Sequence, residues 1–232
     1  MGRLIEDPAL RDRTGVFRDR RDAGRRLARA LGEFQGRGLV LYAIPAGGVP
    51  VAAEIALAFK VPLDLIIVRK IQLPWTTEAG FGALDQEGKA LFNDALVAQV
   101  GLTPQEIDTQ VRKTLASLRE REARLRGSRP YPDLKGAPVM VVDDGLASGY
   151  TMRAAVRFLK GKGAGEVIVA VPTGSRRTVA ELLPQVEVLA CLNVRGGWSF
   201  AVADAYDLWY DLTEAEVQEI MAEVTAAREE AG

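Results

Sequence analysis

The chain has 232 residues, of which 30 are basic, 31 are acidic and none is histidine. Its near-neutral charge and its apolar content of 48% are ordinary for a globular protein, and they exclude disordered and collagen-like chains. Without histidine the chain cannot hold a Ser-His-Asp triad, a histidine general base or a mixed His/Cys zinc site, which excludes hydrolases of those kinds.

The same counts bear on the surroundings and partners of the protein. Cys191 is the single cysteine, and its apolar neighbours mark it as a core residue in a reducing compartment. The N-terminus lacks the apolar stretch of a secretory signal, and no apolar run approaches the ~20 residues that cross a membrane. We therefore expect a cytoplasmic protein with no membrane partner. The balanced charge offers no broad basic field for a nucleic acid, so small molecules are the expected partners.

In chain order the sequence predicts helices that alternate with strands. Helical spacing of apolar residues and capping signals predict helices over residues 19–34, 51–59, 103–127 and 151–160, from Ser175 to Pro184, and from Thr213 onward. Short continuous apolar runs predict buried strands over residues 39–44, 63–68, 139–142, 167–171 and 186–192. Residues 72–78 lack any periodicity, which predicts a loop.

This alternation implies right-handed crossovers and an α/β fold, namely a doubly wound, mainly parallel sheet flanked by helices. We expect one domain over residues 1–232, with a core over about 15–194 and a small hood from terminal segments, whose C-terminal part and final helix cover about 195–232. Ligands of such sheets bind outside the carboxyl ends of the strands. Those strand ends are therefore the places to look for a site.

The strongest motif follows the strand over residues 139–142. It consists of two carboxylates and a loop of small residues that opens a helix: Asp143, Asp144, Gly145, Leu146, Ala147, Ser148, Gly149, Tyr150 and Thr151. The amides of residues 147–151, with the hydroxyls of Ser148 and Thr151, can form an anion nest at the helix N-terminus. Gly145 and Gly149 permit positive φ and a close approach of the ligand.

Two carboxylates in front of such a nest would repel a phosphate. They are better suited to bind the hydroxyls of an attached sugar or to stabilise positive charge on it. A sugar phosphate is therefore the predicted ligand of the loop. The alternative is that Asp144 and Gly145 form only a turn and that Ser148 only caps the helix.

The run over residues 139–151 resembles the phosphoribosyl diphosphate signature of the type I phosphoribosyltransferases. Segments 17–20, 44–52 and 78–84, with Ala23, Gly24, Arg69 and Lys70, resemble a bacterial subgroup of that family. The resemblance implies that Asp143 and Asp144 hold the ribose hydroxyls of the substrate. It also implies that residues 147–151 hold the 5′-phosphate, which agrees with the anion nest expected from the loop residues themselves.

The resemblance identifies Pro45, Ala46, Gly47 and Gly48 as the diphosphate loop, where a tight turn without a ligand is the alternative. In the family this loop often contains a non-proline cis peptide, which we expect between Ala46 and Gly47. Related sequences commonly carry a basic residue where Ala46 stands. Arg69 and Lys70, which follow the second strand, are the expected substitutes as diphosphate ligands; the alternative is that they are solvated surface charges.

The resemblance implies that a nitrogen nucleophile displaces diphosphate from C1 of phosphoribosyl diphosphate. Mg²⁺ would be bound mainly through substrate oxygens, so no dedicated metal ligands are expected from the protein. Some purine enzymes of the family place an aspartate general base where this chain has Ala147, and Glu78 is the nearby acid that we nominate instead. Residues 71–78 match a lid over the reacting centre, in which Trp75 is either a lid contact or a packed loop residue.

In this family terminal segments form a hood that selects the acceptor base. Trp198 and Phe200 are the candidates to stack on that base, although they could simply pack the hood onto the sheet. The acceptor itself is not identified by the sequence. A homodimer is compatible with this interpretation.

Two other functions are consistent with the same residues. Alanine at positions 46 and 147 favours a non-catalytic sensor that binds phosphoribosyl diphosphate or a nucleotide and regulates a partner. A local basic face for nucleic acid could be made by one predicted helix, from Arg20, Arg21, Arg25, Arg26 and Arg29. The other alternative is an unrelated sugar-phosphate enzyme that uses the same anion nest.

Overall fold

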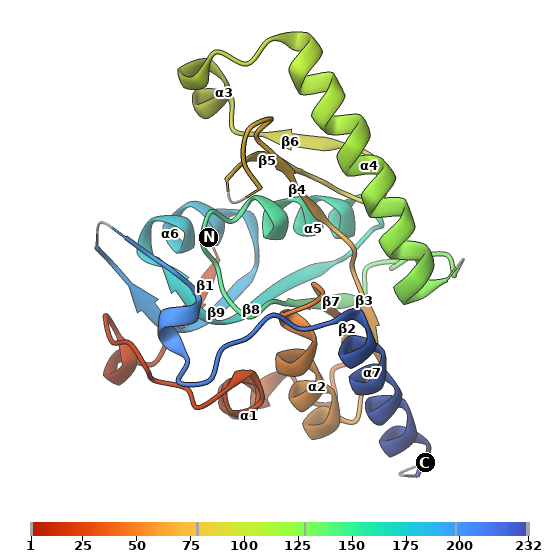
Figure 1. Cartoon of the computed structure of the whole chain (residues 1–232). Helices are drawn as coiled ribbons and strands as arrows, with labels where there is room; N and C mark the ends of the chain where they lie inside the picture. Colours follow the sequence, from red (N-terminus) through yellow and green to blue (C-terminus); the bar gives the residue numbers. More distant parts are fainter. Residues whose placement is uncertain (1, 78, 128, 198, 231–232) are drawn as a thin grey trace.

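The computed structural model describes residues 2–77, 79–127, 129–197 and 199–230. Its centre is a six-stranded sheet in the order β1, β9, β8, β7, β2, β3, in which every neighbouring pair is parallel (Figure 1). The strands are β1 (Arg3–Ile5), β2 (Val40–Ala43), β3 (Leu63–Leu65), β7 (Pro138–Val142), β8 (Glu166–Ser175) and β9 (Val188–Arg195). The predicted α/β fold with a mainly parallel sheet is confirmed.

Helices cover both faces of this sheet (Figure 1). On one face lie α1 (Arg20–Ala30), α2 (Gly48–Phe59) and α7 (Glu214–Glu229); on the other lie α5 (Tyr150–Gly161) and α6 (Arg176–Leu182). Because side chains alternate along a strand, Met140 and Val142 of β7 point into one apolar cluster while Val139 and Val141 point into the other. Burial on both sides explains why the central strands are continuous apolar runs.

Some element bounds differ from those predicted. The predicted helix over 19–34 is α1 followed by a 3-10 turn at Gly32–Phe34, and α2 begins at Gly48 instead of residue 51. The strand predicted over 167–171 runs on as β8 to Ser175, because polar Thr173 is buried and pairs with Asn193 of β9. The predicted helix cap at Ser175 is confirmed, since its side chain accepts a hydrogen bond from the amide of Thr178.

An arm over residues 69–127 stands off the main sheet (Figure 1). It holds an antiparallel sheet of β4 (Arg69–Gln72), β5 (Gly80–Leu84) and β6 (Ala90–Phe92), and the helices α3 (Asp94–Val100) and α4 (Pro104–Arg126). Of these elements only α4 was predicted. Two glycines in β5 weaken its strand signal, yet a Cβ on Gly82 would lie 2.4 Å from the carbonyl oxygen of Leu91, so the tight pairing with β6 needs glycine there.

Within the described part of the chain, no helix combines the length and the apolar character that crossing a membrane requires.

A buried polar contact ties the N-terminal segment to the sheet. The hydroxyl of Thr173 donates to Oδ1 of Asn193 at 2.7 Å, and the amide nitrogen of Asn193 donates to the carbonyls of Leu10 and Arg13. Both side chains are fully buried. The side chain of Asn193 therefore satisfies its own polar groups by joining β8 to the N-terminal segment.

We expect Asn193→Ala to lower the free energy of unfolding by about 2 kcal/mol, because the variant removes the three hydrogen bonds of a fully buried side chain. Urea denaturation measures this change. As a control, Gln99→Ala on the exposed side of α3 should change the free energy by less than about 0.5 kcal/mol. Equal stability of the two variants would contradict the role assigned to Asn193.

Candidate functional site

The acidic pair and the glycine loop after β2 are in direct contact. Asp143 and Asp144 follow β7, and β2 pairs with β7 up to Ala43 and Val142, so both loops leave the same edge of the sheet. A Cβ built on Gly47 would lie 1.8 Å from Oδ2 of Asp144. A Cβ on Gly48 would lie 2.9 Å from Cα of Asp143. A side chain at either position would collide with the acidic pair, so the predicted diphosphate loop and the predicted ribose ligands meet.

A non-proline cis peptide is present in this loop, between Pro45 and Ala46. The expectation of a cis bond between Ala46 and Gly47 was therefore wrong by one position. The sequence does not show which of the two peptide bonds is cis, because that depends on the path of the folded loop. Gly48 then begins α2, whose N-terminus directs its dipole toward the acidic pair.

The loop after the acidic pair is anchored at its base and open at its tip. The amide of Leu146 donates to the carbonyl of Thr173 at 2.9 Å, and the hydroxyl of Thr178 donates to the carbonyl of Ala147. Ala147 and Ser148 are exposed. Gly149, with φ of 77°, caps α5, so the first turn of that helix stands behind the open tip. The predicted nest residues are thus together: Gly145, Ala147, Ser148, Gly149, Tyr150 and Thr151.

Arg20 is a part of this site that the sequence analysis assigned to an exposed basic face. That assignment was wrong, because the side chain is only 7% exposed and its Nε donates to Oδ2 of Asp144 at 2.8 Å. Its Nη1 donates to the carbonyl of Tyr210 at 2.9 Å, and its guanidinium lies 3.8 Å from the ring centroid of Trp209. The available signal was its place in segment 17–20, which resembles the family.

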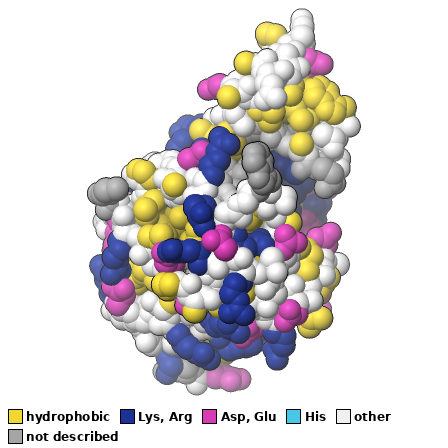
Figure 2. Space-filling view, turned by 90° about the vertical axis from the view of Figure 1, so that its left-hand side faces the viewer, with side chains coloured by type: hydrophobic (Ala, Val, Ile, Leu, Met, Phe, Trp, Pro, Cys, Tyr) yellow, Lys and Arg dark blue, Asp and Glu magenta, His cyan; other side chains and the backbone are white. Residues whose placement is uncertain are grey.

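Three other arginines of the same helix have acidic neighbours. Arg21 contacts Glu54 and Glu223, Arg25 contacts Glu54, and Arg26 contacts Asp22. On the face of the molecule drawn in Figure 2, basic and acidic side chains are intermixed. This arrangement gives no support to a continuous basic surface on that face.

Burial dominates the electrostatics of the acidic pair. Burial raises the pKa of Asp143 well above its usual range, and the neighbouring charge of Asp144 raises it further. Burial also raises the pKa of Asp144, but the guanidinium of Arg20 opposes that increase. We therefore assign the more persistent negative charge to Asp144. Burial likewise raises the pKa of Tyr206, whose hydroxyl donates to the carbonyl of Asp144 at 2.6 Å.

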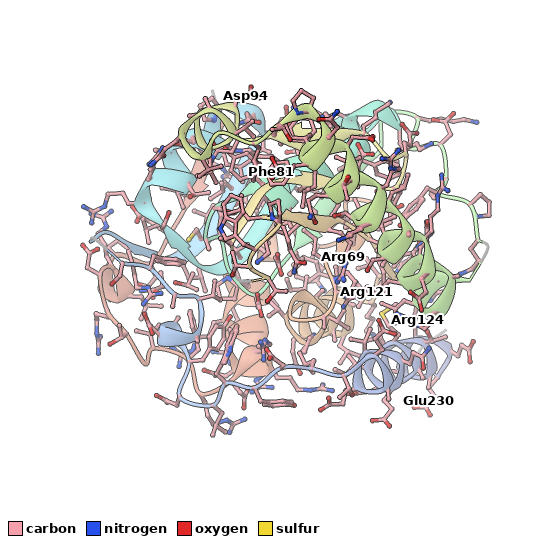
Figure 3. All side chains as sticks on the ribbon, turned by 45° about the horizontal axis from the view of Figure 1, so that its top comes forward. Arg69, Phe81, Asp94, Arg121, Arg124 and Glu230 are labelled. Carbon is pink, nitrogen blue, oxygen red and sulfur yellow. The ribbon has the colours of Figure 1, made fainter. Side chains whose placement is uncertain are left out.

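Several predicted site residues do not contact the acidic pair. Arg69 donates from Nη2 to the hydroxyl of Ser117 on α4 at 2.9 Å, and Figure 3 shows it beside the helix that carries Arg121 and Arg124. Lys70, the next residue of β4, is exposed. Their contact with a diphosphate stays a prediction.

The aromatic candidates have different surroundings. The ring of Phe200 lies 4.5 Å from Cζ of Arg195, so it packs on the end of β9. Trp75, between β4 and β5 in the arm, is 61% exposed. Glu78 and Trp198 lie outside the described residues. The roles of these four residues stay predictions.

We expect Asp143→Asn to increase the free energy of unfolding at pH 7. The raised pKa means that the native state binds the Asp143 proton more tightly than the unfolded chain, so ionisation of Asp143 destabilises the fold as pH rises through the native pKa. Asparagine keeps the oxygen that accepts from the amide of Asp144 and carries no charge. Urea denaturation at several pH values measures the difference.

The advantage of the variant should shrink as pH falls through the native pKa toward the ordinary aspartate value, where both states are protonated. Asp108→Asn, at an exposed position on α4, serves as the control and should not gain stability at pH 7. A lower stability of Asp143→Asn at pH 7 would contradict the assignment.

The sequence of the chain is similar to a known family and to known proteins. The family model of the phosphoribosyl transferase domain matches residues 20–205. Two Mycobacterium tuberculosis proteins are 37% identical to the chain over 202 residues: "Putative phosphoribosyl transferase MT0597" of strain CDC 1551 / Oshkosh and "Putative phosphoribosyl transferase Rv0571c" of strain ATCC 25618 / H37Rv. The matched residues are 87% of this chain and 45% of each relative, so the chain spans about half the length of these relatives.

The fold is also similar to a solved structure. The crystal structure of TT1426 from Thermus thermophilus matches with a TM-score of 0.71 and 34% sequence identity, over 89% of this chain and 98% of that one. The family model covers most of the chain, from the first residue of α1 to the segment after β9. The chain therefore belongs to the phosphoribosyl transferase domain family.

Proposed function

We propose that the chain transfers ribose 5-phosphate from phosphoribosyl diphosphate to a nitrogenous base or a related nitrogen acceptor and releases diphosphate. The observation that carries this proposal is the contact between the acidic pair and Gly47, with the helix-opening loop on the other side of the pair. A sugar with a phosphate at one end and a diphosphate at the other needs three adjacent subsites of this kind. Membership of the family supports the same reaction.

Each subsite has a distinct task in the reaction. The loop over 147–151 binds the 5′-phosphate, Asp143 and Asp144 bind the ribose hydroxyls, and the backbone of Gly47 and Gly48 faces the diphosphate. The bond from C1 to the diphosphate oxygen breaks, and its electron pair leaves with the diphosphate. The lone pair of the acceptor nitrogen forms the new bond to C1, and the nitrogen then loses a proton. The negative charge of the acidic pair stabilises the positive charge that develops on the sugar.

The acidic pair also fits a magnesium ion. Mg²⁺ prefers oxygen ligands and is commonly held by one or two carboxylates together with substrate phosphates. Two carboxylates from Asp143 and Asp144 stand beside the proposed diphosphate loop, so they could hold the ion directly or through water. The ion would be bound mainly through the substrate and would neutralise charge on the diphosphate.

The arm supplies the remaining proposed groups. Arg69 and Lys70 on β4 are proposed as diphosphate ligands, and residues 71–78 are proposed as the lid. The first two residues of that segment, Ile71 and Gln72, belong to β4 and not to a loop. Arg69 uses Nη2 for its bond to Ser117, so the proposed contact with a diphosphate would use the other N–H groups of the guanidinium. We retain Glu78 as the acid proposed to accept the acceptor's proton, and Trp198 and Phe200 as the proposed stacking partners of the base. The natural setting would be nucleotide metabolism in the cytoplasm.

The residues Ala46 and Ala147 favour one second function. Neither methyl group supplies the charge or the general base that the family resemblance leads one to expect, so the same site could bind its ligand without turning it over. A protein of that kind would act as a sensor of phosphoribosyl diphosphate or a nucleotide. Turnover separates the two functions.

We expect phosphoribosyl diphosphate with Mg²⁺ to bind in isothermal titration, and one base in a purine and pyrimidine screen to trigger diphosphate release. Asp144→Asn should weaken binding at least about tenfold through the loss of one charge-assisted hydrogen bond. Binding without release for every base would favour the sensor. If Asp144→Asn bound with unaltered affinity, Asp144 would not be a ligand of the ribose hydroxyls.

We expect Gly47→Ala to weaken binding of the same ligand about tenfold or more while the melting temperature changes little. The new methyl group overlaps the carboxylate of Asp144 and displaces it from its position. Gly32→Ala is the matched control, because a Cβ there meets no atom within 4 Å. Wild-type affinity of Gly47→Ala would show that the contact between the two loops does not shape the ligand site.

A further inference from the structure

We propose that Arg20 is a positioning residue for Asp144, and that residues 206–210, called here the C-terminal strap, hold Arg20 in place. The proposal rests on the proposed function, because Asp144 is taken as a ligand of the ribose hydroxyls. Arg20 itself is assigned no contact with the substrate. Its task is to fix the orientation of the carboxylate that makes the contact.

The start of α1 fixes where the Arg20 side chain begins. Asp19 caps the helix, and its side chain accepts a hydrogen bond from the amide of Asp22 at 2.7 Å. Arg20 is the first residue of the helix, and its side chain is only 7% exposed. A cation buried to that extent requires partners that satisfy it. Asp144, which lies 124 positions further along the chain, supplies the charged one.

The C-terminal strap lies against the segment that precedes α1. Phe17 and Tyr206 form a parallel bridge, and the amides of Asp207 and Leu208 donate to the carbonyls of Phe17 and Arg18, both at 2.9 Å. These bonds place the strap directly beside Arg20. The pairing therefore joins two segments from opposite ends of the chain at the edge of the proposed site.

The strap then holds the guanidinium on two sides. The carbonyl of Tyr210 accepts a hydrogen bond from Nη1 at 2.9 Å, while the indole ring of Trp209 covers the guanidinium at 3.8 Å. Nε remains directed at Asp144, at 2.8 Å. With two hydrogen bonds and a stacked ring, the planar guanidinium has one orientation, which a lysine ammonium could not reproduce.

Asp144 is consequently held at both of its ends. Its carboxylate is bonded to Arg20, and its main-chain carbonyl accepts from the hydroxyl of Tyr206 at 2.6 Å. The backbone of Gly47 limits the carboxylate on the remaining side. A ligand group whose orientation is fixed before binding loses no rotational freedom when substrate arrives, which strengthens binding.

A double-mutant cycle tests whether Arg20 acts through Asp144. Isothermal titration with phosphoribosyl diphosphate and Mg²⁺ would compare the unaltered chain with Arg20→Met, Asp144→Asn and the double variant. We expect Arg20→Met alone to weaken binding about tenfold or more. In the Asp144→Asn background the same change should add almost nothing, because its partner is already absent. A purely structural role would give additive losses instead.

Arg21→Met is the matched control, since Arg21 is the next residue of α1 and contacts Glu54 and Glu223 instead. Its affinity should equal that of the unaltered chain. Unchanged affinity of Arg20→Met, or additive losses in the cycle, would overturn the positioning role alone. Failure of the unaltered chain to bind would overturn the proposed function and this proposal with it.

Two milder variants decide the matter if Arg20→Met does not fold. Arg20→Lys keeps the charge but can reach only one of the two acceptors, and Trp209→Leu removes the stacked ring from a position that is 37% exposed. Both should keep a melting temperature close to that of the unaltered chain and weaken binding several-fold. Full affinity in both folded variants would overturn the proposal.

Discussion

The parallel pairing of β2 with β7 is the constraint on which the proposed site depends. The two strands are in register from Val40 with Val139 to Ala43 with Val142, so the loops that follow them leave the sheet at the same level. One loop carries the glycines and the other carries the acidic pair. Their backbones approach so closely that a side chain on Gly47 would overlap the carboxylate of Asp144. The geometry of the site is thus set by strand register and only refined by side chains.

The burial of two adjacent carboxylates destabilises the fold at the proposed site. Two adjacent carboxylates lose solvent at the strand end, and burial raises the pKa of both. Arg20 offsets part of this cost at Asp144, but Asp143 has no equivalent cationic contact among the described residues. Active sites commonly retain such unfavourable charges, because the same charges stabilise the transition state when a substrate is bound.

The residues of the proposed site come from two parts of the molecule, the main sheet and the arm. The acidic pair, the glycine loop and the loop over residues 147–151 follow strands of the main sheet, whereas Arg69 and Lys70 belong to the sheet of the arm. Arg69 is engaged by Ser117 within the arm. The proposed ribose and 5′-phosphate subsites are therefore formed by loops of the main sheet, while the proposed diphosphate contacts of Arg69 and Lys70 depend on the position of the arm.

Local patterns in the sequence determined much of the fold and the centre of the site. The capping boxes at Thr103 and Thr213, the cap at Ser175 and the acidic loop after β7 all involve residues a few positions apart, so their hydrogen bonds are encoded within one short segment. The apolar runs of the central strands follow from burial on both faces. These features could be predicted because their physical causes are local.

Only the tertiary structure decided the features that join distant segments. The partner of Arg20 lies 124 positions away, the extension of β8 depends on Asn193 in another strand, and β5 depends on close pairing with β6. A charged side chain on a helix has the same sequence signature whether it faces solvent or a buried carboxylate. Its role is defined by which remote backbone packs against it, and no short-range pattern contains that information.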